Sequence, residues 1–437
     1  MRKTVLFLFL TLAPVIFAAK LDIVTRGKSN FKIGEKVTFA VTAFDDNGKL
    51  FNAGTLRLTF RKSGGSVVLK EELVDLAEKG NPFEADVSMN EPGFILMEVS
   101  SLTMPDKSVV KWKTTTPAND LGGAAIEPEK LRAAAPVPED FDEFWANTLK
   151  AFEKTKVVVK PAPGVERAGY KVSFVEIPFP DGSGSIYGFL SIPLEKGKFP
   201  ALVGVPGAGR GRVDPVPYWT PGKKAITLWL NVLPYPPART AAEQRKLYDE
   251  YRKVLEKKNV LKGNYFYYNA GSRDTFFYKN VWAAVSRGVD FVASLPEFDG
   301  KNFAAAGNSQ GGGTALAIAG LNKKISCVVA SVPALCDHGG WLKERRSGWP
   351  KLHEALKGTA DKASAYFDAA TFASRINVPT LVSVGYIDVT CPPASVYCAY
   401  NNLKGKKEIF QMPRHGHRND PKFRKIVERF LDTNLSR

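Results

Sequence analysis

Apolar and polar positions follow two different patterns along this chain, and the pattern changes near residue 116. In the first quarter, apolar residues recur at every second position, as in Val37, Phe39 and Val41, and the pair Asn47-Gly48 then supplies a turn. A period of two is typical of half-buried antiparallel strands, and short strands separated by regular turns are typical of a sandwich. Residues 20–116 are therefore predicted to form an immunoglobulin-like β-sandwich.

The rest of the chain alternates short, continuously apolar runs with longer amphipathic runs. Residues 117–137 are rich in Pro, Ala and Gly and are the predicted linker, after which a helix is expected to start near Asp140. Strands are expected at 199–205, 225–232, 303–306, 325–332, 380–384 and 408–412, and helices at 239–258, 281–295 and 421–434. Apolar strands that alternate with helices indicate a mostly parallel sheet covered by helices on both faces, here over residues 138–437.

The first 19 residues have the composition of a secretory signal peptide. Arg2 and Lys3 precede an apolar run from residue 5 to residue 17, and Ala18 and Ala19 follow it. The run is short for a membrane span, and no later segment is long and apolar enough to cross a bilayer. The mature protein is therefore expected to be exported to the periplasm or the extracellular space, and not to be held in a membrane.

Length and charge narrow the classes of partner. A chain of 437 residues exceeds the size of one compact core, so two or three domains are expected. The formal net charge is +17, but the basic residues are scattered and form neither a tail nor a basic-aromatic tract. We therefore expect a basic surface and no nucleic-acid partner.

The four cysteines are Cys327, Cys336, Cys391 and Cys398. An exported protein permits disulfides between them, and four cysteines allow three pairings. Buried free thiols are an equally good interpretation. None of the four has metal-ligand spacing with a histidine.

Residues 307–311 read Gly-Asn-Ser-Gln-Gly and stand between a short apolar run and an Ala/Leu/Ile-rich helical pattern. This is the G-x-S-x-G motif in the context of a nucleophile elbow, which predicts an α/β-hydrolase fold. At such an elbow the serine occupies a strained strand-to-helix turn, and the flanking residues are glycines because larger side chains would clash. Ser309 is therefore the predicted nucleophile.

A serine hydroxyl needs a base and an acid that orients the base. In this architecture the acid and then the histidine follow the serine, each on a loop after a strand. Asp388 follows the strand expected at 380–384, whereas both His415 and His417 follow the strand expected at 408–412. Asp388 is the predicted acid, and the spacing alone leaves the choice between the two histidines open.

An oxyanion hole needs two N–H donors. One is expected from Gln310, the residue after the nucleophile. The other is expected from Ala208, in the glycine-rich turn that follows the strand at 199–205.

Residues 138–437 resemble the acetyl xylan esterase / cephalosporin C deacetylase family of α/β-hydrolases. The motifs that carry the resemblance are Asp-Phe-Asp-Glu-Phe-Trp at 140–145, Gly-Asn-Ser-Gln-Gly-Gly at 307–312, a strand at 328–332 that ends in Pro333, Tyr-Phe-Asp at 366–368 ahead of Phe372-Ala373, and Gly-Tyr-Ile-Asp-Val-Thr-Cys-Pro-Pro at 385–393 with Tyr400-Asn401 one helix later. The family's terminal Gly-His-Glu matches Gly416-His417, so the resemblance implies that His417 is the base. Arg418 replaces the glutamate, and Pro206-Gly207-Ala208 stands where the family has His-Gly-Tyr.

The resemblance implies hydrolysis of acetyl esters on xylan or xylo-oligosaccharides, without a metal or other cofactor. Simpler relatives form closed oligomers, which leaves a homo-oligomer open here. Trp341 and Trp349 are candidates for a sugar platform, although lone aromatic residues more often serve packing.

Three other interpretations stand beside this one. They are a carboxylesterase for small esters in general, a serine peptidase of the prolyl-oligopeptidase type, and a glycan-binding protein without catalysis. The peptidase is disfavoured because about 100 residues of β sequence cannot supply the propeller of that class.

Overall fold

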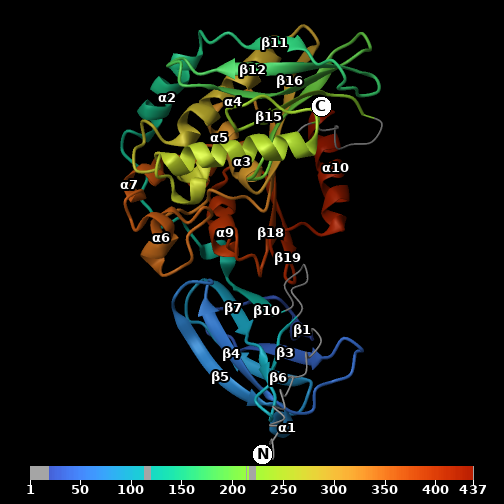
Figure 1. Ribbon diagram of the computed structural model, residues 1–437, viewed down its shortest axis with the longest axis vertical. Helices are drawn as coiled ribbons and strands as arrows, with labels where there is room; N and C mark the ends of the chain where they lie inside the picture. The colour runs from blue at the N-terminus through green and yellow to red at the C-terminus, as the bar shows by residue number, and fades with distance from the viewer. Residues whose placement is uncertain (1–18, 113–119, 213, 216–222, 437) are drawn as a thin grey trace, which may run out of the picture.

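The chain folds into an all-β lobe, built from its N-terminal part, and a larger α/β lobe (Figure 1). The structure, a computed structural model, describes residues 19–112, 120–212, 214–215 and 223–436. Residues 1–18 of the predicted signal peptide therefore lie outside the described residues. So do residues 113–116 of the predicted sandwich and 117–119 of the predicted linker.

The N-terminal lobe consists of two β-sheets around one hydrophobic core. One sheet has the strand order β1-β3-β6, and the other has the order β2-β10-β7-β4-β8-β9 with β5 paired to β4. Phe39 and Val41 of the first sheet and Leu58 and Phe60 of the second are fully buried in the shared core. The alternating residues thus face inward between two layers, as in a sandwich. That the sandwich is immunoglobulin-like stays a prediction.

The elements of this lobe are β1 (Lys20–Thr25), β2 (Asn30–Phe31), β3 (Val37–Phe44), β4 (Thr55–Lys62), β5 (Val68–Asp75), α1 (Leu76–Lys79), β6 (Phe83–Val87), β7 (Gly93–Val99), β8 (Leu102–Thr103), β9 (Val109–Val110) and β10 (Leu121–Ile126).

Strand β10 lies within the predicted linker, and it belongs to the sandwich. It pairs with β7 in antiparallel register along its whole length, from Leu121 opposite Glu98 to Ile126 opposite Gly93. Its small residues suggested a linker, but the packing requires them, because a Cβ on Gly122 would lie 2.7 Å from a methyl carbon of Ile23. The boundary predicted at residue 116 is therefore too early, and the lobe extends to residue 126.

The α/β lobe is organised by a nine-stranded sheet with the order β11-β12-β13-β15-β14-β16-β17-β18-β19. Strands β11 to β13 and the pair β13–β15 are antiparallel, whereas the pairs from β15 to β19 are parallel. The strands are β11 (Val158–Pro161), β12 (Tyr170–Pro178), β13 (Ser185–Pro193), β14 (Phe199–Val205), β15 (Ile226–Asn231), β16 (Phe298–Asn308), β17 (Cys327–Ser331), β18 (Thr380–Gly385) and β19 (Lys407–Met412). The apolar runs of the sequence therefore form the parallel strands, as predicted.

The sheet is covered on both faces, which explains why its strands are continuously apolar. Val203 and Ala305 lie in a large core beneath helices that include α2, α4 and α5. Their strand neighbours Leu202 and Ala304 face the opposite way and pack against Leu431 of α10. Alternate residues of one strand thus enter two separate cores.

The helices of this lobe are α2 (Phe141–Phe152), α3 (Ala241–Lys257), α4 (Phe277–Ala293), α5 (Gln310–Leu321), α6 (Leu352–Leu356), α7 (Asp361–Ser364), α8 (Ala369–Ala373), α9 (Pro393–Asn402) and α10 (Pro421–Leu435), with 3-10 turns η1 (Pro128–Lys130), η2 (Leu261–Gly263), η3 (Tyr265–Tyr267), η4 (Gly340–Lys343) and η5 (Ala365–Phe367). Within the described part of the chain, no helix combines the length and the apolar character needed to cross a membrane.

Candidate active site

Ser309 lies at the turn between β16 and α5, in the middle of the parallel sheet. Its backbone has φ 57° and ψ −121°, a conformation that non-glycine residues rarely adopt and that costs about 1–3 kcal/mol. The turn is held by backbone bonds, because the Ser309 N–H donates to the Ser331 carbonyl over 2.9 Å, and the Ser309 carbonyl accepts from Ala334 N over 3.0 Å. The strand-to-helix turn predicted from the sequence is therefore present.

The glycine at position 311 is required by the close approach of α5 to β14. A Cβ at this position would lie 2.0 Å from the Val205 carbonyl oxygen, well inside any real carbon–oxygen contact. The contact is with backbone, which cannot rotate away as a side chain can. Gly311 therefore lets the helix begin directly against the strand that leads to Ala208.

Gly311→Ala is expected to destabilise the protein by at least about 1–3 kcal/mol, the usual range for overpacking, and to lower the activity. The measurement is the thermal unfolding midpoint, taken together with hydrolysis of a small acetyl ester. Gly271→Ala is the matched control, because its added Cβ would lie 3.5 Å from the nearest atom, the Thr359 carbonyl oxygen. An unchanged midpoint for Gly311→Ala would contradict the close approach.

The acid loop after β18 and the histidine loop after β19 pack against each other through their backbones. Tyr386 N donates to the Met412 carbonyl over 3.1 Å, and Ile387 N donates to the His415 carbonyl over 3.3 Å. A Cβ on Gly385 would lie 2.4 Å from that same His415 oxygen. Parallel pairing of β18 with β19 thus brings residues about 30 positions apart in the sequence to the same sheet edge.

The side chains of Ser309, His417 and Asp388 form one hydrogen-bonded chain. The distance from His417 Nε2 to Ser309 Oγ is 2.8 Å, and the distance from His417 Nδ1 to Asp388 Oδ2 is 2.7 Å. With Nδ1–H donating to the carboxylate, Nε2 is left as the acceptor for the serine proton. The Asp388 side chain is 1% exposed, and that of His417 is 26% exposed.

The second carboxylate oxygen of Asp388 is also occupied. Asp388 Oδ1 accepts from Thr390 N over 2.8 Å and from Cys391 N over 2.9 Å. These two backbone donors fix the carboxylate plane. Oδ2 therefore points at the imidazole in a single orientation.

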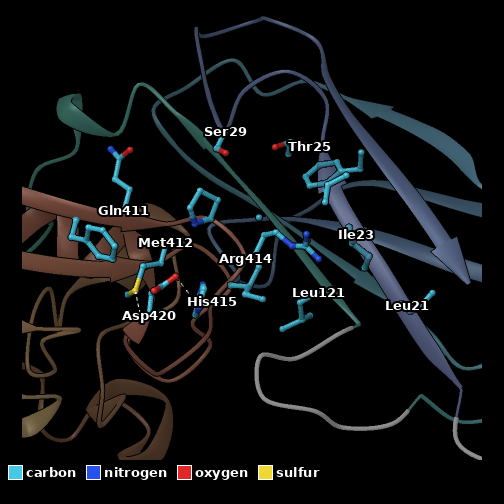
Figure 2. A pocket seen from close by; sticks show the side chains of 17 residues that line it. Leu21, Ile23, Thr25, Ser29, Leu121, Gln411, Met412, Arg414, His415 and Asp420 are labelled. Carbon is cyan, nitrogen blue, oxygen red and sulfur yellow. Dashed lines mark hydrogen bonds and ion pairs between the residues drawn. The ribbon is translucent and has the colours of Figure 1, made fainter. Parts of the chain in front are cut away.

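His415 takes a different place from His417. Its Nε2 lies 3.8 Å from Asp420 Oδ2, and its side chain lines a cleft between the two lobes together with Arg414 (Figure 2). The two histidines that the sequence spacing left open are thus separated by structure, since His417 alone joins Ser309 to Asp388.

The predicted oxyanion donors are the N–H groups of Gln310, in the elbow, and of Ala208, in the turn after β14. The buried side chain of Gln310 connects these two segments. Gln310 Oε1 accepts from the hydroxyls of Tyr265 and Tyr278 over 2.7 and 2.8 Å, and Gln310 Nε2 donates to the Pro206 carbonyl over 3.3 Å. The Tyr265 hydroxyl in turn accepts from Gly209 N over 3.3 Å. The elbow and the turn that contains Ala208 are therefore held together from both sides of that residue.

Sequence reasoning did not single out the groups that support the site. Asn419 donates through Nδ2 to Asn308 Oδ1 over 3.1 Å, and its Oδ1 accepts from the Ser383 hydroxyl over 2.6 Å. It thus ties the elbow to the end of β18. Its position two residues after His417 was the one available signal, but an asparagine in a loop is too common for that signal to be used.

Comparison with known proteins places this geometry in a family. A family model described as acetyl xylan esterase (AXE1) matches residues 126–433, well over half of the chain. The chain belongs to the acetyl xylan esterase family. The residues before 126, which form almost the whole N-terminal lobe, lie outside the match.

Individual relatives agree with the family. The chain is 33% identical over 300 residues to the acetyl esterase Axe7A of Xylanibacter ruminicola, in an alignment that spans 67% of this chain and 66%, just under two thirds, of that protein.

Two solved structures share the α/β-hydrolase fold. The acetyl xylan esterase from Paenibacillus sp. R4 has a TM-score of 0.56 at 24% identity, covering 71% of this chain and 99% of that one. Acetyl Xylan Esterase 1 from Thermoanaerobacterium sp. JW/SL YS485 has a TM-score of 0.52 at 21% identity, covering 70% of this chain and 96% of that one.

The site of this acetyl xylan esterase family member also contains a thiol. Among the described residues, ligand-type atoms of Asp388, Cys391 and His417 lie within 4.8 Å of one another. Asp388 and His417 are already hydrogen-bonded to each other, and burial together with the Asp388 charge raises the pKa of the Cys391 thiol well above its usual range. The ligand-type atoms of Asp388 and His417 are thus engaged in the hydrogen-bonded chain to Ser309.

The remaining predictions concern cysteines and tryptophans. All four cysteines are buried free thiols, which decides between the two interpretations left open by the sequence. Trp341 stacks on the His353 ring at 3.8 Å, and Trp349 packs against Phe266 at 4.6 Å between ring centroids. Both indoles thus have packing partners within the protein, as expected for aromatic residues in general.

Proposed function

We propose that this protein is a serine ester hydrolase that removes acetyl groups from acetylated xylan or xylo-oligosaccharides. The single observation that carries the proposal is the chain of hydrogen bonds from Ser309 through His417 to Asp388. Membership of the acetyl xylan esterase family supports the choice of acetyl ester over other acyl groups.

The proposed reaction has two halves, acylation and deacylation of Ser309, and Ser309, His417 and Asp388 act in both. Ser309 Oγ attacks the acetyl carbonyl carbon while His417 Nε2 takes the hydroxyl proton, and Asp388 stabilises the imidazolium. The negative oxygen of the tetrahedral intermediate accepts hydrogen bonds from the N–H groups of Gln310 and Ala208. The bond to the sugar oxygen then breaks, His417 returns the proton to that oxygen, and Ser309 is left acetylated.

In the second half, water repeats the attack. His417 takes a proton from the water, whose oxygen bonds to the acetyl carbon, and the bond to Ser309 Oγ breaks as the proton returns to it. Acetate leaves and the free serine is restored. No electron acceptor or further reactant is needed, and the proposed reaction uses only groups of this chain and water.

The buried environment supports the same proposal for the nucleophile. Ser309 is 8% exposed, and α5 begins at the next residue, so its first N–H groups point toward the place where negative charge develops. Export through the predicted signal peptide would bring the enzyme to polysaccharide outside the cytoplasm, and it is part of the proposal.

The proposal is tested by acetate release from acetylated xylan, with chemically deacetylated xylan as the blank. We expect acetate to appear from the first substrate and not from the second. A fluorophosphonate probe should label Ser309, located by peptide mass spectrometry, because only an activated serine reacts quickly. Slow labelling without acetate release would instead favour a glycan-binding protein, and turnover of small acetyl esters alone would favour a general carboxylesterase.

A further inference from the structure

The N-terminal lobe contacts the α/β lobe where β18 and β19 end, and these strands lead to Asp388 and His417. A Cβ on Gly123 of β10 would lie 2.8 Å from the Tyr386 carbonyl oxygen. Phe94 of β7 packs edge-on against the Tyr386 ring with centroids 5.1 Å apart. Tyr386 is fully buried, and it precedes Asp388 by two residues. The acid loop is therefore enclosed partly by residues of the other lobe.

One side chain of the N-terminal lobe reaches both strand ends. Asn30, the first residue of β2, accepts through Oδ1 from the Tyr386 hydroxyl over 2.6 Å. Its Nδ2 donates to Gln411 Oε1 over 3.1 Å. Gln411 belongs to β19, six residues before His417, and its Nε2 donates to the Tyr397 hydroxyl over 2.7 Å. The Asn30 amide thus joins the acid loop, through Tyr386, to strand β19, through Gln411.

This bridge lies between two clefts at the lobe boundary. A cleft of about 420 Å³ is lined by Ser29, Gln411 and the histidine loop, with Arg414 in its centre (Figure 2). A second cleft of about 330 Å³ is lined by Asn30, Tyr397 and Gln411. Between these clefts Asn30 makes its two hydrogen bonds, next to the packing of Gly123 and Phe94 on Tyr386.

We propose that Asn30 is a positioning residue that acts across the lobe boundary. By binding Tyr386 and Gln411 at once, its amide keeps the acid loop and the histidine loop at the separation in which Asp388, His417 and Ser309 are hydrogen-bonded. The inference rests on the proposed function of those three residues and adds a role for the N-terminal lobe. That lobe is then part of the catalytic apparatus and not a spacer, although it lies outside the family match.

The expected size of the effect follows from the geometry of proton transfer. Displacing a reacting group by about 1 Å costs up to about 100-fold in rate. Asn30→Leu keeps the approximate shape and removes both hydrogen bonds, so we expect kcat to fall about 10- to 100-fold. Asn30 has no assigned contact with a small ester, so KM should stay unchanged.

The experiment uses the full chain and a small chromogenic acetyl ester, which removes glycan binding from the measurement. Asn30→Asp keeps an acceptor for the Tyr386 hydroxyl but loses the donor to Gln411 Oε1, so it removes half of the bridge and is expected to lower kcat by less than Asn30→Leu. Asp22→Asn is the matched control, because it removes an exposed ion pair with Arg414 across the same lobe boundary, a contact that contributes little. The unfolding midpoint of each variant is measured alongside kcat and KM.

The outcomes separate the two proposals. The expected result is a loss of kcat in Asn30→Leu, a smaller loss in Asn30→Asp and none in Asp22→Asn, at constant KM and with midpoints close to that of the wild type. A wild type that turns over no acetyl ester overturns the proposed function and this inference together. An active wild type whose kcat is matched by Asn30→Leu overturns this inference alone, as does an equal loss in Asp22→Asn, which would indicate general docking of the lobes.

Discussion

Ser309→Ala is expected to lower kcat for acetyl ester hydrolysis by about 10⁴- to 10⁶-fold, because removing the nucleophile of such a site leaves only binding and oxyanion stabilisation. The loss should be in kcat, with substrate affinity retained. The free energy of unfolding should not fall. Alanine is no more strained than serine at φ 57°, and the substitution removes only the oxygen that points to His417. Initial rates on a chromogenic acetyl ester, with the unfolding midpoint, measure both quantities.

Ser294→Ala is the control for this substitution. Ser294 is the exposed C-cap of α4, and its hydroxyl donates to the Phe291 carbonyl over 2.7 Å. The same chemical change there should leave kcat unaltered. If Ser309→Ala retained more than about one part in 100 of the wild-type rate, a nucleophile other than this hydroxyl would have to be sought.

His417→Ala is expected to lower kcat almost as much as Ser309→Ala does, whereas His415→Ala is expected to have only a small effect on kcat. Without the imidazole, Ser309 Oγ has no base at 2.8 Å and Asp388 loses its partner at 2.7 Å, so kcat should fall about 10⁴-fold or more. His415 interacts through its side chain with Asp420 at 3.8 Å, near the surface of the cleft. A 3.8 Å contact between two partly exposed side chains contributes little, so a loss of kcat of less than about fivefold is expected for His415→Ala.

The two histidine variants are each other's control, because they alter the same loop two residues apart. Alanine at position 415 keeps the backbone carbonyl that accepts from Ile387 N, so the loop itself should persist. Equal losses in both variants would mean that the loop tolerates no change, and a larger loss in His415→Ala would exchange the proposed roles. Rates at a single saturating substrate concentration suffice for the comparison.

Much of the architecture could be predicted because local patterns carry it. A period of two predicted the strands of the sandwich, and continuous apolar runs predicted the parallel strands, since each strand is buried on two faces. The glycine spacing around Ser309 predicted the elbow for a steric reason that holds within a few residues of chain. The linker prediction failed where it relied on composition, because Gly122 and Ala124 are small in order to pack within a strand.

The amino-acid sequence by itself determined the two-part organisation, the elbow and the order in which an acid and a histidine follow it, because each depends on neighbours along the chain. The spacing left His415 and His417 open and the family resemblance implied His417. The tertiary structure joins His417 to Ser309 and Asp388, and only there does Asn30 meet Tyr386 and Gln411. The hydrogen bonds of His417 to Ser309 and of Asn30 to its two partners join residues more than 100 positions apart in the sequence. Their geometry depends on how β18 and β19 pair and how the first lobe docks on them, which a local pattern does not encode.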